Sequence, residues 1–379
     1  MHYHGTDVDG PSFDPDTLNV RGRDLNELIR EASYVAAIWH IFTGTLPSPD
    51  EAARLQSFLM RVPAAFPADH AAIRVTRLTA RSGATTARAM SAGLMVDASA
   101  LLGEVQREAR LPELNDDAQS AIANFAVPPL LMSAALFDDD AAAPFRESPD
   151  YVSAMYAAAS RRRFVSAAER RAFEAVLVAL HGGFGVLPPT VQVPRSSIGT
   201  GAPMPHAFAA GYATAGPNHA GAAEESMKLL ARIVEEMAGG DIRERAARAV
   251  TAELGAGRRI YGFGHPLFDA DPRPPVLRAL TIEIGLHSPY LDAWDALVEI
   301  VGASVGVKPN LDSIVAAISL TLGLIPAAGT GVFLCSRTAA MAAHAIERPA
   351  TKPPFGVARR IARKILIATP KEDFAFTPY

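Results

Sequence analysis

The chain has 379 residues, of which 49% are hydrophobic and only 7% aromatic, and its formal net charge is -4. Charges of both signs are mixed along the chain, so the sequence indicates neither a nucleic-acid-binding surface nor a polybasic membrane tail. This length and hydrophobic content allow a large buried core, and we expect two domains. Abundant alanine and short β-branched runs favour packed helices over sheets.

The amino-terminal stretch MHYHGTDVDG has no basic region followed by an apolar one, so it does not resemble a signal peptide. We expect residues 1–20 to be a poorly ordered lead-in. The single cysteine, Cys335, excludes a disulfide framework within the chain and fits a reducing cytoplasm, where we expect the protein to be located.

Helical patterns then follow one another. Asp24 and Glu27 have the spacing of a capping box, and Ser48 is predicted to cap the helix that starts at SPDE, 48–51. Residues 182–205 are so rich in glycine and proline that a long helix is not expected there. Further helical windows cover 88–107, 114–136, 149–180, 221–238, 241–255, 273–287 and 289–304.

Residues 313–336 contain no charged side chain and are long enough to span a bilayer. Pro326 and the GTG sequence at 329–331 divide this segment. We therefore expect a pair of buried core helices and no association with a membrane.

Two histidines lie beside helix-breaking residues. His219 ends the sequence GPNH just before a predicted helix, whose dipole disfavours the imidazolium, so a neutral ring could donate a hydrogen bond to a developing oxyanion. A helix-capping or buried, satisfied histidine is the alternative. His265 ends the sequence GFGH, whose glycines let a substrate approach the backbone, although an ordinary glycine-rich turn has the same composition.

Asp312 ends the sequence PNLD and precedes an apolar helix. Its simplest role is that of an N-cap. The same place beside apolar helices could instead hold a carboxylate away from water, where it becomes a stronger base.

Three arginines are candidates for binding carboxylates. Arg273, in DPR at 271–273, could form two parallel hydrogen bonds, although a surface arginine at a helix start is the alternative. Arg337 is the only arginine, lysine or acidic residue between Asp312 and Glu347, and a buried arginine needs an anionic partner. Arg348 could also be simply exposed. We find no metal-ligand spacing, dinucleotide fingerprint, phosphate loop or nucleophile elbow, so no metal and no permanently bound cofactor are expected.

In chain order these motifs resemble those of the citrate synthase family between Arg21 and Pro349. The resemblance implies an all-α fold with two domains and a homodimer. Residues 221–322 would form the smaller, mobile domain, and 1–220 with 323–379 the large domain and the dimer interface. The matching segments are VRGRDL at 20–25, TGTLP at 43–47, GPNHAGA at 216–222, GFGH at 262–265, DPR at 271–273, PNLD at 309–312, SRTA at 336–339 and ERP at 347–349.

The resemblance also implies a reaction between two small molecules, an acyl-CoA thioester as co-substrate and a 2-oxo acid as acceptor. Asp312 would remove the α-proton of the thioester while His219 binds the enolate oxygen. His265 would polarise the acceptor carbonyl. The resemblance assigns the acceptor carboxylates to Arg273, Arg337 and Arg348, the last reaching the partner subunit's site.

Two departures from the family pattern bear on the substrates. The family has a histidine-rich segment before the first catalytic histidine, and here that region reads HGGFGVL at 181–187. An ungapped count from His219 puts Phe184 in place of the substrate-binding histidine, whereas a gapped alignment makes His181 that residue. If Phe184 is the counterpart, the acceptor is a more apolar 2-oxo acid. Pro266 stands where the family commonly has arginine.

Arg258 and Arg259 lie just upstream of the GFGH sequence. They are candidates for contacts with the CoA phosphates, with a solvated pair of charges as the alternative.

The leading interpretation is an acyltransferase that condenses acetyl-CoA or propionyl-CoA with oxaloacetate or a more apolar analogue. Enolisation, aldol-type bond formation and thioester hydrolysis would follow one another. A citryl-CoA lyase-type cleavage enzyme and a non-catalytic homologue are the alternatives. The presence of His219, His265 and Asp312 argues against the second of these.

Overall fold

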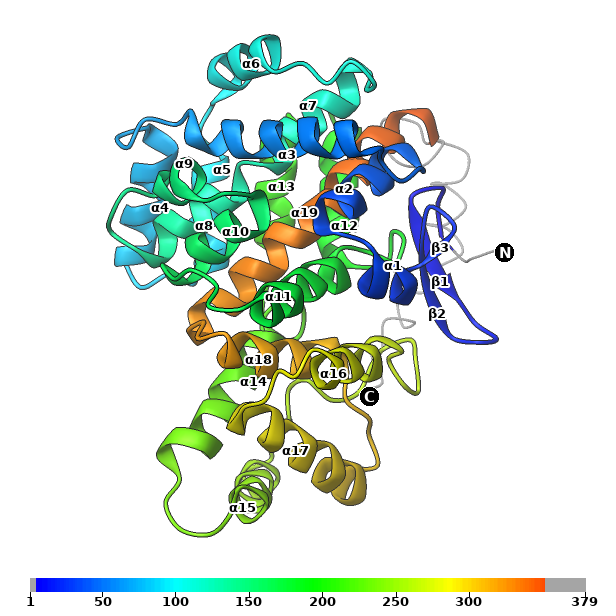
Figure 1. Ribbon diagram of the computed structural model, residues 1–379, viewed down its shortest axis with the longest axis vertical. Coiled ribbons are helices and arrows are strands. Elements are labelled where there is room, and N and C mark those ends of the chain that lie inside the picture. The colour runs from blue at the N-terminus through cyan, green and yellow to red at the C-terminus, as the bar shows by residue number, and fades with distance from the viewer. Residues whose placement is uncertain (1–4, 352–379) are drawn as a thin grey trace, which may run out of the picture.

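The computed structural model of the chain describes residues 5–351 (Figure 1). As the composition predicts, these residues are mainly helical. The helices are α1 (Leu25–Glu31), α2 (Tyr34–Thr43), α3 (Pro49–Ala64), α4 (Ala71–Arg81), α5 (Thr86–Leu94), α6 (Ser99–Glu108), α7 (Asp116–Phe125), α8 (Pro128–Leu136), α9 (Ala143–Glu147), α10 (Tyr151–Ser160), α11 (Ala167–Leu180), α12 (Pro189–Gly199), α13 (Met204–Tyr212), α14 (Ala222–Ala231), the π-helical turn η1 (Arg232–Glu236), α15 (Ile242–Gly255), α16 (Arg273–Glu283), α17 (Pro289–Val305), α18 (Leu311–Thr321) and α19 (Pro326–Thr351).

A small antiparallel sheet precedes the helices, so the prediction of a disordered lead-in is wrong for the described part of 1–20. Its strands are β1 (Asp9–Ser12), β2 (Thr17–Val20) and β3 (Arg23–Asp24), in the order β1-β2-β3. Leu18 and Val20 are buried, and the Asn19 side chain donates to the Ser12 hydroxyl over 3.0 Å. Strands of two to four residues are too short for an alternating pattern to stand out in the sequence.

Local capping explains several helix starts. Ser48 accepts from the Glu51 backbone and Glu51 accepts from the Ser48 backbone, which confirms Ser48 as the predicted cap of α3 and completes a capping box. Asp24 caps α1 by accepting a hydrogen bond from the backbone of Asn26. Within the glycine- and proline-rich stretch, α12 is only eleven residues long and contains Pro194, in keeping with the expectation of no long helix.

The helices are arranged around α11 and α19, which run through the middle of the molecule (Figure 1). The group α14, α15 and α17 lies at one end, and α3 to α10 lie at the other. Helix α19 packs against α7, α8, α12 and α14, and α14 packs against α18. This arrangement brings the segments with the candidate site residues to the middle of the molecule. The predicted domain boundaries at 220/221 and 322/323 stay a prediction.

Residues 313–336 form parts of two helices, α18 and α19, bent by 119° with respect to each other. Ser313 to Leu320 are buried, which confirms the predicted pair of core helices. In the described part of the chain, one segment, Asp116–Leu136, which comprises α7 and α8, is long and apolar enough to cross a membrane, and 83% of its most apolar window is buried inside the protein. The bent pair formed by α18 and α19 also passes the same test of length and composition.

Candidate active site

His219 lies in a tight turn directly before α14. The backbones of Gly216 and His219 donate to each other's carbonyls at 2.9 Å, and Ala220 has a φ of 64°. A Cβ atom on Gly221 would lie 2.7 Å from the Gly216 oxygen, so this turn requires glycine. The His219 Nε2 atom is 3.1 Å from the Thr190 hydroxyl. Burial, and then the nearby charge of Arg337, lower the pKa of His219 to about 4, so its ring is neutral at physiological pH.

His265 is held in one tautomer by the backbone. Its Nδ1 atom accepts hydrogen bonds from the backbone N–H groups of Leu267 and Phe268, at 3.1 and 3.2 Å. Burial lowers the pKa of His265 to about 4, so the ring is neutral and its proton is on Nε2. The ring also packs against Phe184 and Phe268, with centroids 5.3 and 5.0 Å away. His265 therefore presents one fixed hydrogen-bond donor, Nε2.

Asp312 is not the N-cap of α18, contrary to its simplest interpretation. Asn310 takes that place, because its side chain accepts from the Asp312 backbone at 3.0 Å. The Asp312 Oδ1 atom is buried and has no hydrogen-bond partner within residues 5–351. Burial raises the pKa of Asp312 to about 6 against the opposing effect of Arg273, with a further upward contribution from Asp271. The carboxylate is thus free of a capping role and is a stronger base than usual.

Asp271 connects the His265 segment with the start of α18. It accepts from the Leu311 backbone at 2.9 Å and pairs with Arg273. The Asn310 side chain also donates to the Gly264 carbonyl at 2.7 Å. These bonds join the loop before α16 to the residue that precedes Asp312 in the chain.

The Arg273 guanidinium is already paired within the protein. Its Nε and Nη2 atoms donate to the two Asp271 oxygens at 2.9 and 2.7 Å, and Nη1 reaches the Ala179 carbonyl at 3.4 Å. The Phe184 ring lies 4.9 Å from its central carbon. Arg273 is therefore at the site, but its two-pronged face is occupied by Asp271 and not open to a substrate.

Arg337 differs from Arg273 in this respect. It is buried, and its Nε atom donates to the Leu180 carbonyl at 2.9 Å. No carboxylate of residues 5–351 lies within ion-pair distance of it. Burial and the neighbouring Arg273 lower the pKa of Arg337 to about 10, so it remains charged at neutral pH. A buried guanidinium without a carboxylate partner is costly unless an anion binds to it.

Contacts and the mutual effects of the charges place the predicted residues near one another. The Phe333 ring lies 6.3 Å from the His219 ring and 5.1 Å from the Arg337 guanidinium carbon. Arg273 affects the pKa values of His265, Asp312 and Arg337, and Arg337 affects those of Asp312 and His219. Such effects need proximity within the protein. Two imidazoles, a carboxylate and two guanidiniums from four separate segments therefore form one group.

Phe184, not His181, lies against His265. His181 is fully buried, its ring meets Tyr34 edge-on at 6.1 Å, and neither nitrogen has a hydrogen-bond partner in the described part of the chain. Burial lowers the pKa of His181 to about 3. The geometry thus favours the ungapped alignment, and His181, a predicted substrate ligand, lies in the core beside the site.

The remaining arginines lie apart from this group or at its edge. Arg348 is buried eleven residues beyond Arg337 in α19, which is about 16 Å along the helix axis. Arg258 is exposed and paired with Glu253 at 2.6 Å. Arg259 is exposed and donates to the Asn218 side chain at 3.3 Å, next to His219.

Sequence reasoning missed Thr190 and Asp9. Thr190 is fully buried beside His219, and Asp9 accepts hydrogen bonds from the backbones of Gly183 and Gly185 on either side of Phe184. Neither residue belongs to a recognisable motif, so nothing in the sequence marked them.

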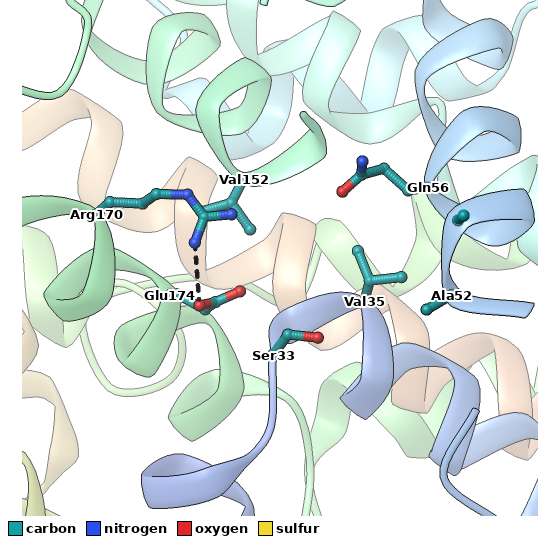
Figure 2. A pocket seen from close by; sticks show the side chains of 8 residues that line it. Ser33, Val35, Ala52, Gln56, Val152, Arg170 and Glu174 are labelled. Atoms are coloured by element: carbon teal, nitrogen blue, oxygen red, sulfur yellow. Dashed lines mark hydrogen bonds and ion pairs between the residues drawn. The ribbon is translucent and has the colours of Figure 1, made fainter. Parts of the chain in front are cut away.

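A separate cavity of about 230 Å³ lies elsewhere, between α2, α3, α10 and α11 (Figure 2). Ser33, Gln56 and the paired Arg170 and Glu174 contribute polar groups to it. None of the residues that line it belongs to the His219, His265 and Asp312 group. In the described part of the chain, no group of three or more histidine, cysteine, aspartate or glutamate residues could hold a metal ion.

Comparison with known proteins places the chain in a family. The family model described as the citrate synthase C-terminal domain matches residues 1–363. This chain belongs to the citrate synthase family. Citrate synthase of Haloferax volcanii is 26% identical over 375 residues, which is 94% of this chain and 90% of that protein.

Solved structures show the same all-α citrate synthase fold. The citrate synthase of Thermoplasma acidophilum, solved as a ternary complex with carboxymethyl coenzyme A and oxaloacetate, has a TM-score of 0.73 at 17% identity, covering 100% of this chain and 96% of that one. Citryl-CoA lyase of Hydrogenobacter thermophilus has a TM-score of 0.51 at 24% identity, covering 62% and 86%. Family membership supports an acyltransferase that uses a CoA thioester, and it confirms the predicted fold.

Proposed function

We propose that this protein condenses an acyl-CoA, such as acetyl-CoA or propionyl-CoA, with a 2-oxo acid and then hydrolyses the thioester. The observation that carries the proposal is the Asp312 carboxylate, whose buried Oδ1 atom has no partner in residues 5–351, although the backbone N–H groups of Leu311 and Asp312 are both hydrogen-bonded. With a pKa of about 6, this carboxylate is ionised at neutral pH and able to accept a proton.

The first step is enolisation. Asp312 takes a proton from the α-carbon of the thioester, and the electrons of the broken C–H bond move to the thioester oxygen. Where the Thr190 hydroxyl donates to Nε2 of His219, the proton of that neutral ring is on Nδ1 and can be donated to the enolate oxygen. A neutral donor suits this step, because it stabilises the enolate without protonating it outright.

The second step forms the carbon–carbon bond. The Nε2–H group of His265 donates to the acceptor carbonyl, and the enolate carbon attacks the carbon of that carbonyl. The new alkoxide takes the proton of the His265 Nε2–H group, which is reprotonated from solvent, and Asp312 releases the proton that it took. Arg337 binds an acceptor carboxylate, because no carboxylate of residues 5–351 pairs with its guanidinium.

Water then cleaves the thioester and releases free CoA and the new carboxylate. Arg259, next to the His219 turn, is better placed than the paired Arg258 to contact the CoA phosphates. We also propose residues 221–322 as the smaller domain, a cytoplasmic homodimer as the working form, and Arg348 as a contribution to the partner subunit's site.

A citryl-CoA lyase-type activity is the second candidate, because the fold also resembles that of a citryl-CoA lyase. The same groups would act in reverse, with Asp312 returning the proton to the enolate carbon after the carbon–carbon bond breaks. A homologue without turnover is a third possibility, against which the retained His219, His265 and Asp312 argue.

One assay separates these candidates. The protein is incubated with acetyl-CoA or propionyl-CoA and a panel of 2-oxo acids, free thiol is followed, and products are identified by mass. Thiol release that depends on a 2-oxo acid and is abolished in Asp312→Ala supports the acyltransferase. Cleavage of citryl-CoA without net synthesis supports the lyase, and silence in both assays with intact ligand binding supports the non-catalytic homologue.

A further inference from the structure

We infer that the acceptor is a 2-oxo acid with a single carboxylate and an apolar side chain, bound between Arg337 and Phe184, and not a dicarboxylic 2-oxo acid. The inference rests on the proposed function of the same site and names its substrate class. Three features of the site carry it: the one guanidinium that lacks a carboxylate partner, the aromatic surface beside His265, and the way that surface is held in place.

Within one protomer, the site offers one guanidinium to an acceptor carboxylate. Asp271 occupies the paired face of Arg273, so Arg337 is the guanidinium that lacks a carboxylate partner in residues 5–351. Asp271 and Arg273 offset each other, as do Asp9 and His344, so Arg337 and Asp312 are the charges of the site that lack an opposite partner in residues 5–351. A second substrate carboxylate would find no unpaired guanidinium of the same protomer in this buried place and would lie near the Asp312 carboxylate, where like charges repel strongly.

Beside the His265 donor the site is aromatic. The Phe184 ring stacks on His265 with centroids 5.3 Å apart, lies 6.1 Å from Phe268, and covers the Arg273 guanidinium at 4.9 Å. Phe13, in the turn between β1 and β2, extends this surface against Phe268 at 5.8 Å. A carboxylate pressed against these rings would lose its water without gaining a hydrogen bond, whereas an alkyl group would be favoured there.

The Phe184 ring is held in place by its own segment. The two Asp9 oxygens accept hydrogen bonds from the backbones of Gly183 and Gly185, at 2.7 and 2.9 Å, on either side of Phe184. These glycines have φ values of 109° and 60°, which side chains other than glycine rarely adopt. Asp9 thus fixes the turn, and Phe184 is a permanent part of the site.

Asp9 is in turn fixed by α19. Its Oδ1 atom is 2.8 Å from the Nε2 atom of His344, and both side chains are buried. The charges that face this pair are Arg195 and Glu347, beside His344, and Arg337, whose charge acts on Asp9. Asp9 and His344 are therefore positioning residues for Phe184, and they need not touch the substrate.

The test compares acceptors matched in size. Thiol release from acetyl-CoA or propionyl-CoA is measured with pyruvate, 2-oxobutyrate and 3-methyl-2-oxobutanoate, and with oxaloacetate and 2-oxoglutarate. We expect kcat/KM for the best monocarboxylic acid to exceed that for oxaloacetate by about 10²-fold, the discrimination of an apolar pocket against an analogue of similar size that carries a polar group. An equal or greater kcat/KM for oxaloacetate would overturn the inference and leave the proposed function standing.

Two variants make the test specific to Phe184. In Phe184→His, a hydrogen-bond donor replaces the apolar ring, and the ratio of monocarboxylic to dicarboxylic activity should fall at least about tenfold. In Phe184→Leu, which stays apolar, the preference should remain monocarboxylic. The ratio does not depend on how much protein is folded, so an unchanged ratio in Phe184→His contradicts the inference.

If no acceptor supports turnover, the proposed function fails, and the substrate class is tested by calorimetry with pyruvate and oxaloacetate. Tighter binding of pyruvate to the wild-type protein upholds the class. Tighter binding of oxaloacetate, or binding of neither acid, overturns it.

Discussion

Two groups of buried charges contact helix α19, and only one of them is fully paired. In the first group, which we call the anchor, Asp9 binds His344 at 2.8 Å, and Arg195 binds Glu347 at 2.7 Å. Burial alone would lower the pKa of His344, but the Asp9 carboxylate has a larger opposite effect, so the pKa of His344 is raised. Burial alone would raise the pKa of Glu347, but His344 and Arg195 lower it to about 2. Every charge in the anchor faces an opposite one.

The second group, around Arg337 and Asp312, leaves its charges without such partners in residues 5–351. Burial raises the pKa of Asp312 to about 6 and lowers that of Arg337 to about 10, so both groups are driven towards their neutral forms. The comparison shows how to separate two uses of buried charge. Paired charges stabilise one shape, whereas charges without partners keep their bonding capacity for a ligand.

The largest expected effect is on the rate. Asp312→Asn keeps the shape of the side chain but removes the base, so thiol release in the presence of an accepted 2-oxo acid should fall about 10²–10⁴-fold. The matched control is Asp292→Asn, a change at an exposed aspartate in the first turn of α17, which should leave the rate unchanged. Equal rates in the wild type and Asp312→Asn would remove Asp312 from the chemistry.

Breaking the anchor should act on stability and on selectivity together. Asp9→Asn removes one charge of a buried pair, so the free energy of unfolding, measured in urea, should fall by about 3–5 kcal/mol. Because the turn that carries Phe184 loosens, the preference for monocarboxylic acceptors should also weaken. A loss of stability with an unchanged acceptor ratio would show that Asp9 is merely structural.

Arg337 should affect acceptor binding more than the chemical step. Charge-assisted hydrogen bonds contribute about 1.5–3 kcal/mol each, so Arg337→Met should raise the KM of the acceptor by about 10²-fold and change the KM of the acyl-CoA little. Arg337→Lys keeps the charge without the planar fork and should have a smaller effect. Steady-state kinetics with each substrate varied in turn checks this, and an unchanged acceptor KM in Arg337→Met would contradict the proposed contact.

The uncompensated carboxylate should also lower stability at high pH. Because the pKa of Asp312 is raised to about 6, the folded protein holds this proton more tightly than the unfolded chain. The resulting stabilisation is complete below the unfolded pKa of about 4 and is lost as the pH rises through 6. The free energy of unfolding of Asp312→Asn should therefore exceed that of the wild type by about 2–3 kcal/mol at pH 8, and the two should not differ at pH 4. Equal stabilities at pH 8 would place Asp312 in a solvated setting.

The smallest effect is expected in the pH dependence of activity. Below pH 6, protonation of Asp312 should lower kcat/KM about tenfold per pH unit. His219 and His265, with pKa values of about 4, should add no further step between pH 5 and 8. A step near pH 7 in the wild-type profile would mean that one of these rings is charged in the working enzyme.

The fold class and the paired core helices α18 and α19 could be predicted from the sequence, because they depend on composition and local patterns. The catalytic roles of His219, His265 and Asp312 stay a prediction, although local motifs were enough to name these residues. Partners that are distant in the chain could not be predicted. Asp9 lies 174 positions before Gly183, and no pattern connects an aspartate in a short strand with the backbone of a distant turn. The choice between His181 and Phe184 also needed geometry, since both alignments fit the same letters.

The interpretation of Asp312 as the N-cap of α18 was wrong for a different reason. Asn310 and Asp312 are both good caps, and the sequence does not say which of the two has the extended backbone that a cap requires. Asn310 has it, which leaves Asp312 inside the first turn. Local propensity therefore predicted the start of the helix within two residues but did not decide which of the two residues is the cap.

The central claim is that Asp312 and His219 act on the same proton transfer. The most direct test is the rate of thiol release by the double variant Asp312→Asn/His219→Gln, compared with both single variants under saturating substrates. Because residues that act as one unit lose their effect together, the double variant should be within a few-fold of the slower single variant. A double variant whose loss equals the product of the two single losses would contradict the account, since each residue would then act independently.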